Sequence, residues 1–149
     1  MHMIAYTSHY SGSIKDIEST LTAIVKTAKH NNPEQGITGV LFFDRDRFVQ
    51  VIEGEKTALD ALLARIKEDP RHDHIDVIFN VEKEDREFAD WNMDAFEIGG
   101  HSRLDAELLE HFRSVYLQNF RVSSVQVVDW IKRLIKDPDR FAKVFNGED

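Results

Sequence analysis

The stretch at residues 37–55, ITGVLFFDRDRFVQVIEGE, constrains the fold of this chain more than any other. Two apolar runs, residues 38–43 and 48–53, flank a short polar turn at residues 44–47, which is the pattern of a β-hairpin. Both runs are apolar with little alternation, so we expect both faces to be covered and the hairpin to lie at the centre of a sheet. The rest of the chain should therefore be organised around this hairpin.

Gln50 interrupts the second apolar run, between Val49 and Val51. A side-chain amide that is buried without partners costs roughly 1–3 kcal/mol. A lone glutamine in a strand more often faces solvent, and the sequence pattern by itself leaves that interpretation open. If Gln50 is buried instead, its amide needs hydrogen-bond partners.

The remaining segments predict further strands and amphipathic helices on both sides of the hairpin. Tyr6 lies within the first strand, whereas Tyr10 is expected in the turn that follows it. The first helix should end at Asn31-Asn32-Pro33, because the residue before a proline is pushed out of the helical region. The predicted strands are residues 3–7, 38–43, 48–53, 75–82 and an irregular fifth at 88–96. The first predicted helix begins at residue 14, and the other three cover residues 58–67, 104–119 and 124–136.

This order of elements predicts an α+β fold with a ferredoxin-like βαββαβ core, an extra fifth strand and two C-terminal helices. The two core helices belong on one face of the sheet, and the apolar stripes of the C-terminal helices can cover the far face. Gly99-Gly100 is the best boundary in the chain. We therefore predict a core domain at residues 1–98 and a helical extension at 99–149.

Composition excludes several classes of function. The net charge of −8 argues against non-specific binding to nucleic acid or to an anionic membrane. The absence of cysteine excludes disulfides, thiolate metal sites and cysteine nucleophiles. No apolar run approaches the ~18 residues of a membrane span, and no cleavable apolar segment is visible at the N-terminus, so we expect a cytoplasmic protein.

The space between the two core helices is the first place to look for a ligand. Taken singly, the polar residues at the helix ends have ordinary roles as a helix stop, a turn or a solvated loop. Taken together, they give a site that is apolar between the helices and polar at its rim, which suits a flat heteroaromatic ring with a phosphorylated tail. The apolar candidates are Ile24, Ala28 and Ile66, and the polar candidates are Asn31, Asn32, Arg65, Asp69, Arg71 and His72.

Other kinds of chemistry have weaker support. His72 and His74 could ligate a metal with nearby aspartates, but histidines this close on a loop are usually just polar, so no metal site is predicted. Ser8 and His9 are not part of a triad, and no glycine-rich phosphate loop is present. A small hydrolase of the acylphosphatase type, with Arg65 or Arg71 binding phosphate, is one rival interpretation. An adaptor that binds flavin or protein without photoactivity is another.

Five segments in order resemble the signature segments of BLUF domains, the blue-light sensors that use FAD. They are IAYTS, HNNPEQGITGVLFF, FVQVIEG, ARIKEDPRH and REFADWNM, and the resemblance covers roughly residues 3–96. The resemblance implies a non-covalently bound FAD whose ring lies between the two core helices. The C-terminal helices resemble those of short, single-domain members.

The resemblance also implies a role for individual residues. Tyr6 resembles the photoactive tyrosine of the family, and Gln50 the glutamine between that tyrosine and the flavin. Asn32 would hydrogen-bond the ring with Asn31 beside it, Ile24 and Ile66 would clamp its faces, and Phe48 would pack near the tyrosine. The remaining matches are Arg65, Asp69, Arg71 and His72 at the flavin rim and tail, and Trp91 and Met93 as a signalling pair on the fifth strand.

Family behaviour implies a light sensor and not an enzyme. Light would drive transfer of an electron and a proton from Tyr6 and back, and Gln50 would end with rearranged hydrogen bonds. The fifth strand and the C-terminal helices would then carry the signal to an unidentified protein partner or to a second copy of the chain, with a homo-oligomer as the expected assembly.

Overall fold

The central hairpin of the sheet is made of β2 (Thr38–Asp44) and β3 (Arg47–Gly54). The computed structural model describes residues 1–97, 110–111, 113–114, 123–136 and 143–145, and its strands form one sheet with the order β4-β1-β3-β2-β5-β6. The hairpin turn needs only Arg45 and Asp46, with Arg45 at a left-handed φ of 63°. The predicted position of the hairpin at the centre of the sheet is confirmed.

Two strands extend the sheet beyond β3. β1 (His2–Tyr10) pairs antiparallel with β3 and, on its other side, with β4 (His72–Glu82). The expectation that Tyr10 lies in a turn is wrong, because pairing of Tyr10 with His72 extends both strands. Tyr10 is buried, and its ring packs edge-on against Phe43 and Phe48.

On the other side of the hairpin, β5 (Asn92–Glu97) runs parallel to β2. β5 starts later than predicted, since Phe88 and Trp91 lie in the connection before it. A short strand, β6 (Lys143–Phe145), pairs antiparallel with β5 and was not predicted. Three residues are too few to show a strand pattern in a sequence.

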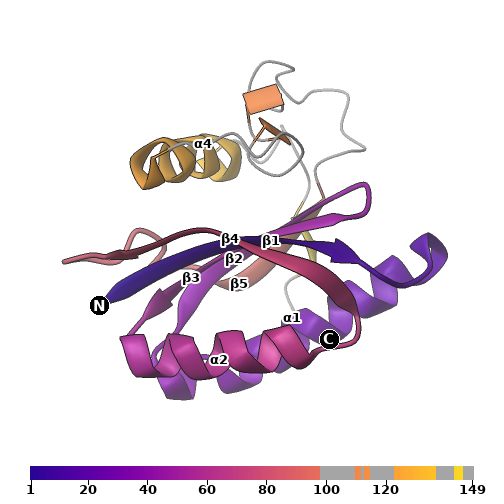
Figure 1. Cartoon of the computed structure of the whole chain (residues 1–149), viewed down its shortest axis with the longest axis horizontal. Coiled ribbons are helices and arrows are strands. Elements are labelled where there is room, and N and C mark those ends of the chain that lie inside the picture. The colour runs from indigo at the N-terminus through magenta and orange to yellow at the C-terminus, as the bar shows by residue number, and fades with distance from the viewer. Residues whose placement is uncertain (98–109, 112, 115–122, 137–142, 146–149) are drawn as a thin grey trace.

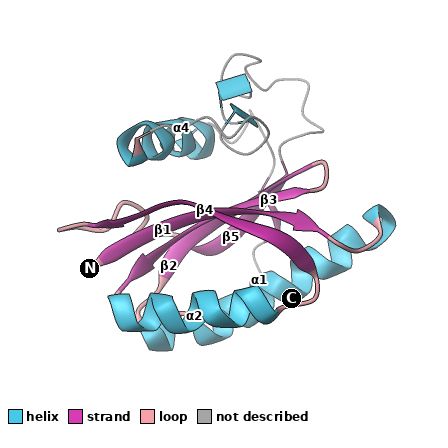
Figure 2. Cartoon of the chain, viewed as in Figure 1, coloured by secondary structure: helices cyan, strands magenta, loops and turns pink. Residues whose placement is uncertain are grey.

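Helices cover both faces of this sheet (Figure 1). α1 (Ile17–Asn31) and α2 (Lys56–Glu68) lie on one face, and α4 (Ser124–Lys136) lies on the other, as Figure 2 shows by element type. Short 3₁₀ helices at Ile14–Asp16 and Pro33–Gln35 flank α1. The predicted α+β, ferredoxin-like fold is confirmed.

Alternate strand residues supply two separate cores. Even-numbered residues of β1 such as Ile4 face α1 and α2, and odd-numbered ones such as Met3 face α4. On the α4 side, the helix contributes three buried apolar residues from its described side chains: Val127, Val128 and Ile131. This confirms that one C-terminal helix covers the far face.

Ser123 caps α4, because its hydroxyl accepts the backbone N–H of Gln126 at 3.2 Å while the Gln126 side chain accepts the N–H of Ser123 at 3.2 Å. The other predicted C-terminal helix, at residues 104–119, lies mostly outside the described residues, although residues 110–111 and 113–114 are helical. The predicted boundary at Gly99-Gly100 also lies outside them.

Each helix among the described residues is too short or too polar to span a bilayer.

Candidate functional site

Tyr6 and Gln50 face each other across the pairing of β1 and β3, on the side of the sheet covered by α1 and α2. The Tyr6 hydroxyl donates a hydrogen bond to Gln50 Oε1, and Gln50 Nε2 lies 3.0 Å from the sulfur of Met93. Gln50 is only 6% exposed. The question left open by the sequence is therefore settled in favour of a buried amide with partners.

Tyr6 is held in its neutral, donating form. Burial raises the pKa of its phenol well above the ordinary value, and the negative charge of Asp69 raises it further. A neutral phenol keeps a proton to give to an amide oxygen. The pair thus has a defined polarity, with Tyr6 as donor and Gln50 as acceptor.

A cavity of about 250 Å³ lies between α1 and α2 and is floored by β1, β2 and β3. Ligand pockets usually range over roughly 300–1,000 Å³, so this one suits a ring system better than a whole dinucleotide. All the residues predicted to be photoactive or to contact a cofactor line it: Tyr6, Ile24, Asn31, Asn32, Phe48, Gln50, Arg65, Ile66, Asp69, Arg71 and His72. Ala28 also lines the cavity, as its place between the helices suggested.

Three lining residues were missed in the sequence: Thr27, Leu41 and Leu62. Thr27 and Leu62 lie one helical turn from predicted members of the site, so helical spacing could have identified them. Leu41 pairs directly with Gln50 in the hairpin. This pairing depends on the length of the turn, which is two residues in the structure and was not known from the sequence.

Ile24 and Ile66 stay half-buried although they belong to the apolar stripes of their helices. The reason is that they face the cavity and not the sheet. Of the α2 residues, only Leu59 is fully packed into the core. The two helices therefore leave apolar walls free to take up a flat ring.

Asn32 caps the C-terminus of α1. The residue is buried, with only 3% of its surface exposed, and it lines the cavity. Its backbone carbonyl accepts hydrogen bonds from the N–H groups of Gln35 and Ile37. Within the described residues, its side-chain amide makes no hydrogen bond. A buried amide of this kind fits a ligand with donor and acceptor groups on its edge, as a flavin ring has.

Asp69 and Arg71 form a tight pair at the rim of the cavity. The Arg71 guanidinium donates from Nε to both carboxylate oxygens at 2.9 and 3.0 Å, and its backbone N–H donates to Oδ1 at 2.9 Å. These hydrogen bonds lower the pKa of Asp69 and raise the pKa of Arg71, so both are charged at neutral pH. Arg65 is exposed, and its guanidinium donates to Gln35 Oε1 at 3.3 Å.

His72 is the first residue of β4 and not part of a solvated loop. Its Nε2 lies 2.8 Å from the carbonyl oxygen of Ile66, which can only accept, so Nε2 carries the proton. Its Nδ1 lies 2.7 Å from the hydroxyl of Ser8. The ring is thereby fixed beside Tyr6, with the ring centroids 6.3 Å apart.

Trp91 and Met93 lie on opposite faces of the sheet. Met93 is fully buried on the cavity side and has a left-handed φ of 61°, an uncommon conformation for a residue with a side chain. Trp91 packs edge-on against Phe96 in the core under α4, with the ring centroids 5.6 Å apart. Of the two, Met93 is the one that touches Gln50.

Comparisons with known proteins show what this chain is similar to. A family model described as "BLUF: Sensors of blue-light using FAD" matches residues 1–94. The photoactivated adenylate cyclase subunit beta of Euglena gracilis is 36% identical over 74 residues, which is 49% of this chain and 9% of that protein. The chain therefore spans about a tenth of the length of this relative.

Two solved structures show the same fold over most of the chain. BlsA in its ground state superimposes with a TM-score of 0.75 at 21% identity, covering 92% of this chain and 89% of that one. The dark state of the BLUF protein BlrB superimposes with a TM-score of 0.67 at 26% identity, covering 90% of this chain and 93% of that one.

Proposed function

This chain belongs to the BLUF family of blue-light sensors that use FAD, and from that premise we propose that it is a photoreceptor whose switch is the Tyr6–Gln50 pair. The observation that carries the proposal is the buried Gln50 amide, which accepts from Tyr6 at one end and meets Met93 at the other. A side-chain amide offers a donor and an acceptor, so it can exchange what it presents to its neighbours.

We propose FAD as the cofactor, with its ring in the cavity between α1 and α2. When bound, the flavin would supply the absorption of blue light and an acceptor for one electron. Asn32 would hydrogen-bond the ring edge with Asn31 beside it, Ile24 and Ile66 would contact its faces, and Phe48 would pack near the tyrosine. Arg65, Asp69, Arg71 and His72 would lie at the rim, where the tail leaves the cavity.

The proposed cycle uses groups of this chain. With flavin bound, Tyr6 would pass an electron and its phenolic proton to the flavin and then regain both, so no covalent change would remain. During that exchange the Gln50 amide loses its donor and can reorganise. Met93, in contact with Gln50, then transmits the change to β5. The output would be a changed contact with a protein partner or a second copy of the chain, without catalysis by the chain itself.

An absorption spectrum of the purified chain before and after blue light tests this proposal. We expect a yellow protein with a reversible red shift under illumination, which Tyr6→Phe and Gln50→Leu abolish while flavin stays bound. Tyr10→Phe is the matched control, because Tyr10 is a second buried tyrosine on the same face of β1 and does not line the cavity. Its red shift should match that of the wild type.

Each contrary result points elsewhere. A colourless protein that binds no added flavin would exclude a flavoprotein and favour the hydrolase. Bound flavin without a red shift would favour a non-photoactive adaptor. A red shift that survives in both Tyr6→Phe and Gln50→Leu would reject the proposed switch. Chromatography of the released flavin distinguishes FAD from FMN.

A further inference from the structure

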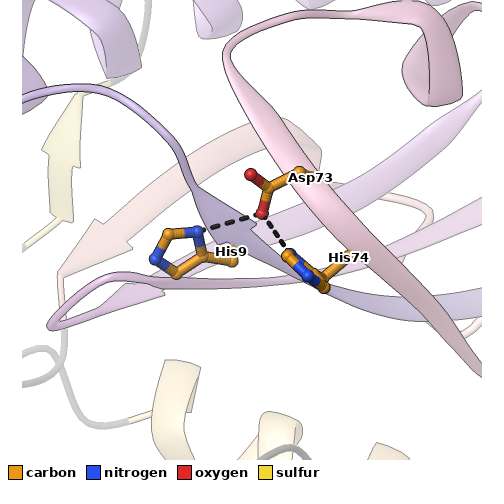
Figure 3. A group of neighbouring side chains, drawn as sticks. All are labelled: His9, Asp73 and His74. Atoms are coloured by element: carbon orange, nitrogen blue, oxygen red, sulfur yellow. Dashed lines mark hydrogen bonds and ion pairs between the residues drawn. The ribbon is translucent and has the colours of Figure 1, made fainter.

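A group of metal-ligating side chains lies at the edge of the sheet, outside the cavity described above. His9 on β1 pairs in register with Asp73 on the neighbouring strand β4, and His74 follows Asp73. Figure 3 shows the two imidazoles directed at the same carboxylate. Nδ1 of His9 lies 3.0 Å and Nδ1 of His74 lies 2.6 Å from the same oxygen, Asp73 Oδ1.

The spacing of these three atoms suits a small metal ion. All three ligand atoms lie within 4.8 Å of one another. Around a tetrahedral Zn²⁺, with bonds of roughly 2.0–2.2 Å, neighbouring ligand atoms are about 3.3 Å apart. Asp73 and His74 are exposed and His9 is half-buried, so rotation of the two exposed side chains can widen the present separations of 2.6 and 3.0 Å toward this distance.

The backbone brings these residues together through two local irregularities. His74 has a left-handed φ of 52°, which is uncommon for a residue with a side chain. The pairing of β1 with β4 also shifts register between Thr7 and His9. Irregularities of this kind are frequent beside functional sites because they redirect side chains.

A second carboxylate completes the arrangement around His9. Nε2 of the same ring lies 3.3 Å from Asp46 Oδ2, in the hairpin turn. Histidines that bind metals usually donate their other ring nitrogen to a carboxylate, which fixes the tautomer and strengthens the ligand.

We propose that His9, Asp73 and His74 bind one divalent transition-metal ion of the zinc class, with Asp46 as the outer partner of His9. Two imidazoles and one carboxylate are ligands typical of Zn²⁺ and are a poor set for Mg²⁺ or Ca²⁺, which prefer oxygen. His74 is 80% exposed, so water can occupy the fourth position. None of the three residues lines the cavity between α1 and α2.

Calorimetric titration of ZnCl₂ into the whole purified chain tests the site, with MgCl₂ as the comparison ion. Because the chain has no cysteine, thiolates cannot contribute to the signal. We expect one zinc ion per chain and no heat from MgCl₂. His9→Gln and His74→Gln should each weaken binding at least 100-fold, and Asp46→Asn should weaken it roughly 10- to 100-fold.

His30→Gln is the control, because His30 is exposed near the end of α1 and is not a member of this group. Its affinity should equal that of the wild type. Failure of the wild type to take up zinc would reject the proposal, as would unchanged affinity in both His9→Gln and His74→Gln. In either case, the group would be a hydrogen-bonded pair of histidines around Asp73. The measurement reads heat and not colour, so its outcome is independent of the photoreceptor proposal.

Discussion

The two ends of the Gln50 amide meet very different neighbours. Oε1 accepts a hydrogen bond from the Tyr6 phenol, whereas Nε2 faces the thioether of Met93, which is a weak acceptor and has no donor. If the amide turned over, its oxygen would face a group that cannot donate. The observed orientation is therefore preferred until Tyr6 loses its proton or another group in the cavity offers a donor.

Glu53 is a fully buried carboxylate on the same strand as Gln50. Its oxygens accept the backbone N–H groups of Glu87 at 2.5 Å and Phe88 at 2.8 Å, and the Thr38 hydroxyl lies 3.2 Å away. Glu53→Gln would put an amide N–H against a backbone N–H. We expect a loss of about 1–3 kcal/mol of unfolding free energy, measured by urea denaturation.

Glu55→Gln provides the control for this loss. Glu55 is exposed and lies two residues farther along the chain, so the same chemical change there should leave the free energy of unfolding within about 0.5 kcal/mol of the wild type. Equal effects of the two substitutions would contradict a structural role for the buried carboxylate.

At the scale of single residues, the sequence predicted the members of the site that carry unusual chemistry. Gln50 stood out as an amide in an apolar strand, and Asn32 as a polar residue at a helix end. Thr27 and Leu41 were missed because nothing in their chemistry separates them from ordinary helix and strand residues. The buried role of Glu53 was also missed, since its partners are backbone groups far away in the sequence.

At the scale of elements, the apolar periodicity of the sequence predicted most bounds of the helices and strands. The exceptions lie where pairing between strands extends an element beyond its apolar pattern. The polar run His72-Asp73-His74 does not look like a strand, yet β4 begins there because β1 continues to Tyr10 and pairs with it. β4 is an edge strand, and charged side chains on an edge hinder pairing with other chains. The polar and charged side chains that protect this edge also interrupt the apolar pattern, so the start of β4 could not be predicted from the sequence.

Packing of α4 on the sheet leads to a prediction about stability. Ile131 is fully buried between α4 and the sheet, so Ile131→Ala should lower the free energy of unfolding by about 2–5 kcal/mol in urea denaturation. Val125→Ala is the matched control, because Val125 lies on the same helix and is 72% exposed. If both substitutions cost less than about 0.5 kcal/mol, α4 does not stabilise the sheet as described.

At the scale of the whole molecule, β5 connects the cavity side of the sheet to the α4 side. Met93 contacts Gln50 on one face, whereas Phe96 stacks against Phe42 on the other, with the ring centroids 5.5 Å apart. Just before β5, Glu87 pairs with Lys132 on α4. A change that begins at Gln50 can therefore reach α4 through packed side chains and an ion pair, without a large movement of the sheet.

Hydrogen exchange in the dark and under blue light tests this route, given the proposed photoreceptor function. We expect the backbone amides of β5 and α4 to exchange at least about threefold faster under illumination, because their packing is loosened, while those of β1 and β3 stay the same. Gln50→Leu should remove the difference while leaving dark exchange unchanged. Faster exchange confined to α1 and α2 would instead place the output on the cavity side, and a light effect that persists in Gln50→Leu would separate the output from this amide.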